Sequence, residues 1–260
     1  MSFEWNAKEY HAHSLIQYRA ARDILSWINF QGNEQVLDLG CGDGKITQEI
    51  AIEVPGGSVQ GLDKSNAMIQ FAKKKYPSDL HKNLLFTCQD ANQIKYINKF
   101  DLVFSSFMLQ WVFDKRHLFF LIYRALVDFG RFCATMPLGY SAELERSVGM
   151  LVSTKKWEKY FANFKKSWDF SDEQAIKTDL NNSGFVIQNI RRVCQTHVFE
   201  SEKAFSLYVG QWLPHLVAIP SGLKFSFLNE LIDVYLGLIQ PNTTGKVYFK
   251  FPRLDFVVGV

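Results

Sequence analysis

Short apolar runs alternate with amphipathic stretches through the first half of the sequence. Between these runs, apolar residues recur at helical spacing, as at Ile46, Ile50 and Val54. This alternation predicts an α/β fold with a doubly wound, mostly parallel sheet and helices on both of its faces. The runs that we expect to be strands are residues 35–39, 58–62, 84–88, 102–105 and 131–135.

The pattern changes after residue 137. Residues 138–184 have helical spacing, residues 185–200 indicate a strand, residues 201–245 form a second helical block, and residues 246–260 end in another strand. We therefore expect one domain overall. Its core is residues 1–137 with an N-terminal helix, and the two late strands complete a seven-stranded sheet. The two helical blocks are expected to form a cap over the sheet edge at which α/β proteins bind ligands.

Composition and charge exclude several classes of function. Of the 260 residues, 47% are hydrophobic and 21% are charged, which predicts a packed core rather than disorder. The net charge of +3 is spread evenly over both halves, so a nucleic-acid partner is not expected. No stretch is long and apolar enough for a membrane span, and the first residues do not resemble a secretory signal.

The four cysteines stand alone in the sequence, without the close pairing that metal sites use. We expect neither a metal site nor disulfides, and a reducing, cytoplasmic location fits best. The cysteines are Cys41, Cys88, Cys133 and Cys194.

A glycine-rich segment, VLDLGCGDGKITQEIA at residues 36–51, carries the most specific signal. An apolar strand runs into Gly40, Gly42 and Gly44, and a helix follows at once. Glycines at such a junction let the backbone turn sharply and approach a ligand closely. A dinucleotide-binding loop would need a glycine at position 45, where Lys45 stands, and the phosphate-binding Walker pattern is also absent.

Acidic residues follow the ends of three successive predicted strands. Asp38 could hold an ammonium group, Asp63 a pair of ribose hydroxyls, and Asp90 the exocyclic amine of an adenine. Each of them alone could instead be a helix cap, and the glycines alone could be a tight turn. Together, the three acceptors predict S-adenosylmethionine as the ligand.

The same segments resemble the class I S-adenosylmethionine-dependent methyltransferases, which have a Rossmann-like sheet. The matching segments are LDLGCGDG (37–44), GLDKSNAMIQFAKK (61–74), CQDANQI (88–94) and FDLVFSSFMLQWVFD (100–114). The resemblance implies that Asp63 holds the ribose hydroxyls, with Lys64 and Met68 near the adenine. It also implies that Asp90 and the N–H of Ala91 read the adenine edge. The residues that it places on the methionine and ribose side are Asp38, Gly40, Cys41, Gly42 and Gly44, with Ser105 near the methionine moiety.

A narrower similarity points to a subgroup that methylates carboxylic acids. It includes trans-aconitate methyltransferases, the malonyl-carrier methyltransferase of biotin synthesis and juvenile hormone acid methyltransferases. The segments that carry this similarity are WNAKEYHAHSLIQ (5–17), SSFMLQWV (105–112) and, for the helical cap, FLNELIDVYLGLI (227–239). The resemblance implies that Tyr10, Gln17, Gln110 and Trp111 border the site of methyl transfer. The chain departs from the family at residues 127–130, where Val-Asp-Phe-Gly replaces a Pro-Gly-Gly turn.

These residues predict transfer of a methyl group to a small acid, free or bound to a carrier protein, to give a methyl ester. A carboxylate is ionised at pH 7 and needs no general base. Gln17 and Trp111 can donate hydrogen bonds to its oxygens. Methylation of a nitrogen, carbon or hydroxyl oxygen is the alternative, with His11 or His13 as the base. A binding module without turnover is a third possibility.

Two further groups of side chains are expected to be structural. Arg191 and Arg192 lie next to each other on a late strand, so that at most one can face a pocket, and we expect both on a solvated face. The aromatic residues of the two insertions are expected to form the core of the cap; they include Trp157, Phe161, Phe164 and Trp212.

Overall fold

The structure is a computed structural model that describes residues 5–239 and 245–260. The outer ends of two predicted segments, residues 1–4 and 240–244, lie outside the described residues. The described chain divides into two compact units. The core unit comprises residues 5–138, 169–193 and 253–260, and the helical unit comprises residues 139–168 and 194–252 without the gap.

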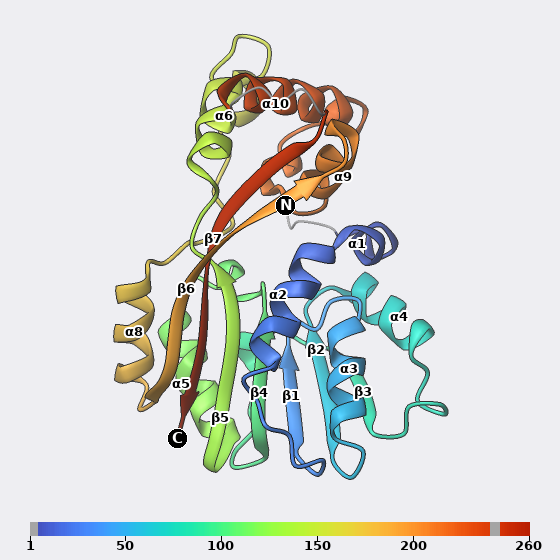
Figure 1. Cartoon of the computed structure of the whole chain (residues 1–260), viewed down its shortest axis with the longest axis vertical. Coiled ribbons are helices and arrows are strands. Elements are labelled where there is room, and N and C mark those ends of the chain that lie inside the picture. Colours follow the sequence, from blue (N-terminus) through green and yellow to red (C-terminus); the bar gives the residue numbers. More distant parts are fainter. Residues whose placement is uncertain (1–4, 240–244) are drawn as a thin grey trace. The chain divides into compact units, whose positions relative to one another are not determined.

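A seven-stranded sheet organises the core unit, in the order β3-β2-β1-β4-β5-β7-β6 (Figure 1). Strands β1 to β5 are parallel, and β7 runs antiparallel to β5. This confirms the predicted α/β, Rossmann-like sheet. The strands are β1 (Gln35–Leu39), β2 (Ser58–Asp63), β3 (Leu84–Cys88), β4 (Phe100–Ser106), β5 (Leu126–Pro137), β6 (Val186–Phe199) and β7 (Val247–Gly259).

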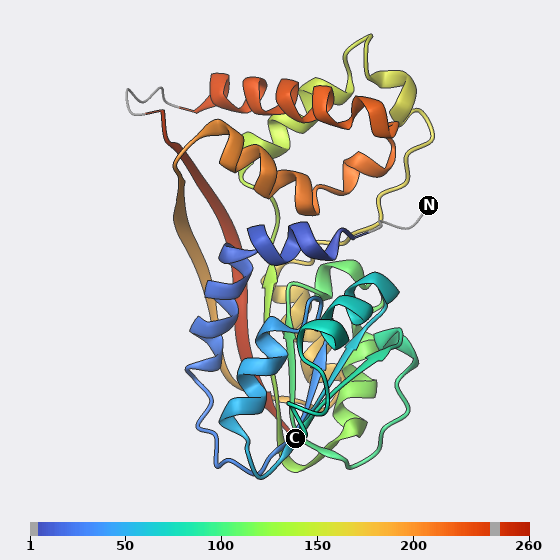
Figure 2. The same cartoon turned by 90° about the vertical axis from the view of Figure 1, so that its right-hand side faces the viewer.

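Helices cover both faces of this sheet, because successive strand residues point to opposite sides. On β1, Leu37 and Leu39 pack into a core with α5 and α8, whereas Val36 packs into the other core with α2, α3 and α4. The two views of the core unit show these layers (Figure 2). The helices of the core unit are α1 (Ala7–His13), α2 (Leu15–Leu25), α3 (Lys45–Glu53), α4 (Asn66–Lys75), α5 (Lys115–Ala125) and α8 (Glu173–Asn182).

The helical unit has an aromatic core of its own. Trp157 is fully buried there; its indole Nε1 donates to Glu230 at 2.8 Å, and its ring contacts Phe227 edge to face. Trp157 is therefore a core residue, as its sequence context suggested. The helices of this unit are α6 (Ala142–Val152), α7 (Glu158–Phe161), α9 (Glu202–Trp212) and α10 (Lys224–Leu238).

Two details of the core unit differ from the sequence-based expectation. Helix α8 lies inside the predicted cap segment 138–184 but belongs to the core unit, because Ile176 and Leu180 pack with α5 under the sheet. Residues 127–130 form no separate turn before the strand. They form an irregular bulge within β5, where Phe129 has a φ of +64°. On β4, Phe100 pairs with Leu126 and Leu102 pairs with Arg131, so that a step of two residues on β4 faces a step of five residues on β5.

Local signals explain several element boundaries. The side chain of Ser65 accepts from the N–H of Met68 at the start of α4, and that of Asp114 accepts from the N–H of His117 at the start of α5. Within the described ranges, no helix is long and apolar enough to cross a membrane.

Replacing Gly44 with alanine should destabilise the core unit. An added Cβ would lie 2.6 Å from Cζ of Phe86, and the φ of +78° is unfavourable for any residue with a Cβ. We expect a loss of about 1–3 kcal/mol, seen as a lower urea midpoint by circular dichroism. The control is Gly149→Ala, since nothing lies within 4 Å of its added Cβ in α6. This control should leave the urea midpoint unchanged or raise it. An unchanged midpoint in Gly44→Ala would contradict the prediction, because it would show that Phe86 can move to accommodate the added Cβ.

Candidate active site

The glycine-rich loop between β1 and α3 is hydrogen-bonded to the end of β2. The N–H groups of Gly40 and Cys41 both donate to the carbonyl of Leu62, at 2.7 and 2.9 Å. The N–H of Gly42 donates to Oδ2 of Asp63 at 3.0 Å. The loop therefore connects the ends of the first two strands.

The glycines of this loop are required for different reasons. An added Cβ at Gly40 would lie 2.4 Å from Cγ of Met108, so packing excludes a side chain there, as it does at Gly44. At Gly42 the nearest atom would be Cε1 of Tyr10, at 3.8 Å. Gly42 has a φ of +54°, and an added Cβ would only reach van der Waals contact with Tyr10, so the backbone conformation rather than packing favours glycine there.

A pocket opens beside this loop, and its lining comes entirely from the core unit. The N-terminal helices contribute one wall, the glycine loop and the start of α3 contribute another, and β4 contributes the floor. The lining residues are Tyr10, Ser14, Gln17, Tyr18, Asp38, Gly40, Cys41, Gly42, Asp43, Lys45, Ile46, Phe104 and Ser106. Six predicted site residues are thus brought together: Tyr10, Gln17, Asp38, Gly40, Cys41 and Gly42.

Asp38 is the most unusual charged group of this pocket. Its side chain is buried, and its Oδ2 accepts from the hydroxyl of Thr47 at 2.7 Å. Its pKa is raised to about 7, mainly by burial; the Thr47 hydroxyl opposes the shift, and the nearby Asp63 and Asp43 carboxyl groups add to it. A buried carboxylate of this kind favours a bound cation, because the cation would compensate the cost of removing the charge from water.

Gln17 presents a buried amide to the same pocket. Its side chain is 8% exposed, and its Oε1 has no hydrogen-bond partner among the described residues. A buried amide oxygen without a partner costs free energy, so such groups are uncommon unless a ligand or water satisfies them. Gln17 therefore has hydrogen-bonding capacity that a ligand in this pocket can use.

The predicted adenine side lies along the ends of β2 and β3, outside the lining of this pocket. Asp63 is half-buried and accepts from the N–H groups of Gly42 and Ser65, and its desolvation raises its pKa. Asp90 accepts from the N–H of Asn92, so part of its capacity caps the short 3-10 helix Ala91–Gln93. Lys64 is largely exposed, with its Nζ 3.7 Å from Oδ2 of Asp90, and Met68 is buried within α4. The adenine and ribose roles of these residues stay predictions.

The serines at the end of β4 differ in their surroundings. Ser105 is fully buried, and its hydroxyl donates to the carbonyl of Leu39 at 3.0 Å. Ser106, its neighbour, lines the pocket together with Phe104. The alternation of a strand explains this difference, since Phe104 and Ser106 point to the same side. The residue next to the predicted one is thus the one placed to contact a ligand.

The predicted acceptor-side residues Gln110 and Trp111 lie in a 3-10 turn, Leu109–Trp111, after β4. The turn follows Phe107, which has a φ of +53°, and Nε2 of Gln110 donates to the Phe107 carbonyl at 2.7 Å. Trp5 contacts both the Trp111 ring and the Tyr10 ring edge to face, at centroid distances of 5.8 and 5.4 Å. Through these ring contacts the turn is connected to Tyr10 in the pocket wall.

Sequence reasoning missed the pairing of His11 with Asp43. The Nδ1 atom of His11 lies 2.7 Å from Oδ2 of Asp43, and the His11 ring packs against Phe71 of α4. His11 is therefore engaged with the glycine loop rather than merely exposed, while His13 lies 3.5 Å from Glu9 on its own helix. The positions of Asp43 between two glycines and of a histidine on the preceding helix were visible, but no spacing rule connects them.

Comparison with known proteins identifies the family. A family model described as "Methyltransferase domain" matches residues 30–184, more than half of the chain. The chain belongs to this methyltransferase domain family. Trans-aconitate 2-methyltransferase of Deinococcus radiodurans is 26% identical over 262 residues, an alignment that covers 97% of this chain and 97% of that protein.

Solved structures agree on the fold of this methyltransferase. Phosphoethanolamine N-methyltransferase 2 of Haemonchus contortus, solved with S-adenosyl-L-methionine, superposes with a TM-score of 0.58 and 20% identity over 93% of this chain and 52% of that chain. The [4+2]-cyclase SpnF superposes with a TM-score of 0.60 and 17% identity, over 93% and 80% of the two chains. At these identities the likeness shows the fold alone.

The protein is thus an S-adenosylmethionine-dependent methyltransferase, and the pocket residues fit this cofactor. Asp38 offers a buried carboxylate for the ammonium group, and Gly42 leaves room where a Cβ would otherwise stand. Within the described part of the chain, no group of three or more His, Cys, Asp or Glu side chains could hold a metal ion.

Binding of S-adenosylhomocysteine should depend on pH through Asp38. The free carboxyl has a pKa of about 7, and a bound ammonium group favours its ionised form. We expect full affinity near pH 8 and a decrease that approaches about tenfold per pH unit below 7, with protons released on binding at pH 6.5. Titration calorimetry in two buffers of different ionisation enthalpy measures both effects.

The control for this titration is Asp38→Asn, which keeps the size of the side chain and cannot ionise. Its affinity should be weak and nearly independent of pH between 6 and 8. Because ionisation of buried Asp38 destabilises the ligand-free fold as pH rises from about 4 to 7, the variant should also unfold at a higher temperature at pH 8. If the unsubstituted protein bound S-adenosylhomocysteine equally well at pH 8 and pH 6, the assignment of Asp38 to the ammonium group would be contradicted.

Proposed function

We propose that this methyltransferase transfers the methyl group of S-adenosylmethionine to a carboxylate oxygen of a small molecule, giving a methyl ester. The observation that carries the proposal is the buried Gln17 amide in the pocket wall. Its N–H groups can donate to a carboxylate, and its oxygen, which has no partner among the described residues, can accept from a water or a protonated group beside it. An amide can bind an acceptor without neutralising it, because it donates through its N–H groups and exchanges no proton. The near full-length similarity to a trans-aconitate 2-methyltransferase supports the same class of acceptor.

The lining of the pocket also favours an acceptor that is already ionised. Its side chains include an amide, hydroxyls and carboxylates, and neither His11 nor His13 belongs to it. The lining also contains the carboxyl groups of Asp38 and Asp43. In the proposal Asp38 binds the ammonium group of the cofactor, and Asp43 lies 2.7 Å from Nδ1 of His11. A carboxylate needs no proton removed before it attacks, so this lining suffices for it.

The reaction then depends on binding and alignment. Bound S-adenosylmethionine supplies an electrophilic methyl group on a positively charged sulfur. In the proposal, Asp38 holds the ammonium end, and Asp63 and Asp90 hold the ribose and the adenine. Gln17 and the indole N–H of Trp111 hold the acceptor carboxylate, and Tyr10 closes the pocket over Gly42. Holding both reactants in line replaces a bimolecular encounter, which is the main contribution that the protein can make here.

The rival proposal is methylation of a nitrogen or hydroxyl oxygen, and one observation favours it. His11 and Asp43 lie 2.7 Å apart at the glycine loop, an arrangement in which a carboxylate can orient an imidazole as a general base. If His11 acts in this way, its loss must abolish turnover. If it only holds α1 to the loop, its loss leaves the chemistry intact.

Removing the donors should separate acceptor binding from cofactor binding. Gln17→Leu and Trp111→Phe each remove hydrogen-bonding groups and keep most of the volume. A hydrogen bond to a charged group contributes about 1.5–3 kcal/mol, so kcat/KM for the acid should fall about 10- to 100-fold. The dissociation constant of S-adenosylhomocysteine should change less than about threefold. The assay transfers labelled methyl to trans-aconitate and a panel of mono-, di- and tricarboxylic acids, and scores the label that mild base releases as methanol.

His11→Gln is the matched control, because it keeps a polar side chain beside Asp43 but removes the base. The carboxylate proposal expects this variant to retain most of its esterification. Base-stable methylation of an amine or alcohol, lost in His11→Gln and kept in Gln17→Leu, would overturn the proposal in favour of its rival.

A further inference from the structure

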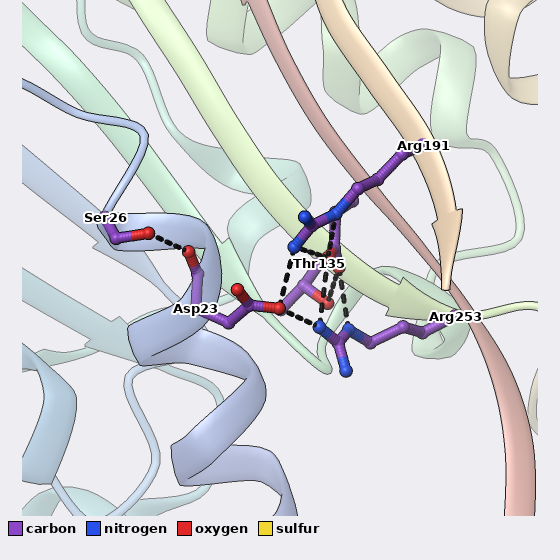
Figure 3. A network of polar contacts seen from close by, with 6 residues as sticks. Asp23, Ser26, Thr135, Arg191 and Arg253 are labelled. Atoms are coloured by element: carbon purple, nitrogen blue, oxygen red, sulfur yellow. Dashed lines mark hydrogen bonds and ion pairs between the residues drawn. The ribbon is translucent and has the colours of Figure 1, made fainter. Parts of the chain in front are cut away.

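A cluster of four charged residues lies within the core unit, outside the lining of the pocket (Figure 3). Asp23 comes from the last turns of α2, Arg191 from β6, and Arg253 and Asp255 from β7. Arg253 and Asp255 are almost completely buried, at 2% and 0% exposure. Two carboxylates and two guanidinium groups balance in charge, so the cluster has no excess charge with which to bind an ion.

Both carboxylates of this cluster are shared between the two arginines. Oδ2 of Asp23 accepts from the guanidinium groups of both Arg191, at 2.7 Å, and Arg253. Asp255 accepts from Arg253 at 2.9 and 3.1 Å and from Arg191 at 3.3 Å. Arg191 also stacks over the ring of Trp27, 4.4 Å from its centroid. Helix α2 is thereby fixed to two strands that are formed more than 160 residues later in the chain.

An acidic residue near the C-terminal end of a helix is normally unfavourable, because the helix dipole places negative charge there. Asp23 occupies such a position in α2 and is stabilised by the two arginines. Gln17 lies six residues earlier on the same helix, about 9 Å along its axis. The arginine contacts therefore constrain the helix that carries Gln17 into the pocket wall.

The same cluster reaches the second segment of the proposed acceptor site. Oδ1 of Asp255 accepts from the hydroxyl of Thr135 at 2.7 Å, on β5. The Thr135 carbonyl in turn accepts from the N–H of Phe107 at 2.9 Å. Phe107 starts the turn to Gln110 and Trp111, and its strained φ of +53° needs such support from its surroundings.

We propose that Asp23, Arg191, Arg253 and Asp255 form a positioning network that fixes the Gln17 helix and the Gln110–Trp111 turn relative to each other. None of the four is a catalytic residue in this proposal. They act through the two segments to which they are bonded. This proposal rests on the proposed function, because it assumes that these two segments contact the methyl acceptor.

Asp23→Asn is the decisive variant, because Asp23 is partly exposed and the substitution keeps its shape. It leaves two guanidinium groups with a single carboxylate. We expect kcat/KM for the acid acceptor to fall about tenfold or more, while the affinity for S-adenosylhomocysteine changes less than about threefold. Asp23→Glu, which keeps the charge, should recover a large part of the activity. The matched control is Arg22→Gln, the neighbouring residue, whose exposed pair with Glu49 at 3.7 Å should contribute little.

A double-mutant cycle with Gln17→Leu tests whether Asp23 acts through Gln17. If it does, Asp23→Asn should cost little in the Gln17→Leu background, so that the two effects are not additive. Additive losses, or equal losses in Arg22→Gln, would overturn the proposal, because they indicate general destabilisation.

Amide hydrogen exchange tests the network independently of turnover, so that it gives a result even if no acid is methylated. With S-adenosylhomocysteine bound, Asp23→Asn should accelerate exchange in peptides covering residues 14–18 and 107–112, and leave residues 62–75 unchanged. Faster exchange at both segments without any esterification would support the network and contradict only the carboxylate acceptor. Unchanged exchange at both segments would overturn the network itself, whatever the acceptor is.

Discussion

The burial of carboxylates at the ends of parallel strands is the constraint around which the core unit is arranged. At the ends of β1 and β2, the carboxyl groups of Asp38 and Asp63 are desolvated, and this desolvation raises the pKa of both. Asp63 is compensated by two backbone N–H groups, from Gly42 and Ser65. Asp38 is bonded to the neutral hydroxyl of Thr47, which compensates much less than a cation would. Ionised Asp38 therefore destabilises the ligand-free fold, and a cationic ligand bound there would offset that cost.

Helix α2 connects this constraint to the acceptor side. Its N-terminal half places Gln17 and Tyr18 in the pocket, and its C-terminal half is held by the arginines of β6 and β7. Tyr18 adds a hydrogen bond to Glu49 of α3, the helix that follows the glycine loop. One helix therefore contacts α3 through its N-terminal half and the late strands through its C-terminal half. In our proposal, the contacts with the late strands fix the position of Gln17.

Sequence reasoning was strongest where chain direction alone determines geometry. Strands β1 and β3 have the predicted bounds, and because the strands are parallel, Asp38 and Asp63 had to end at one edge of the sheet. The alternation of β4 could also have identified Ser106 rather than Ser105, since Phe104 and Ser106 share a side. The prediction named Ser105 because it followed the family pattern instead of the strand period.

Contacts between distant segments could not be predicted in this way. Arg191 was expected on a solvated face, because a strand pattern does not reveal which helix covers a side chain. In the structure it is bonded to Asp23, 168 residues earlier, and to Asp255. Helix α8 has ordinary helical periodicity, which indicates a buried face but not which unit buries it. The Arg191 side chain is 41% exposed, so the expectation missed its partners rather than its exposure. The contacts of Arg191 and of α8 both arise from tertiary pairing, for which a single sequence has no local signal.

The two polar clusters of the core unit differ in a way that separates structure from function. In the network of Asp23, Arg191, Arg253 and Asp255, each charged group has an opposite charge within hydrogen-bond distance. In the pocket, buried Asp38 is bonded to a neutral hydroxyl, and the oxygen of Gln17 has no partner in the described chain. A protein that buries polar groups at a cost retains them where a ligand completes their bonds. We therefore propose that the compensated cluster holds the segments in place, and that the uncompensated pair binds the cofactor and the acceptor.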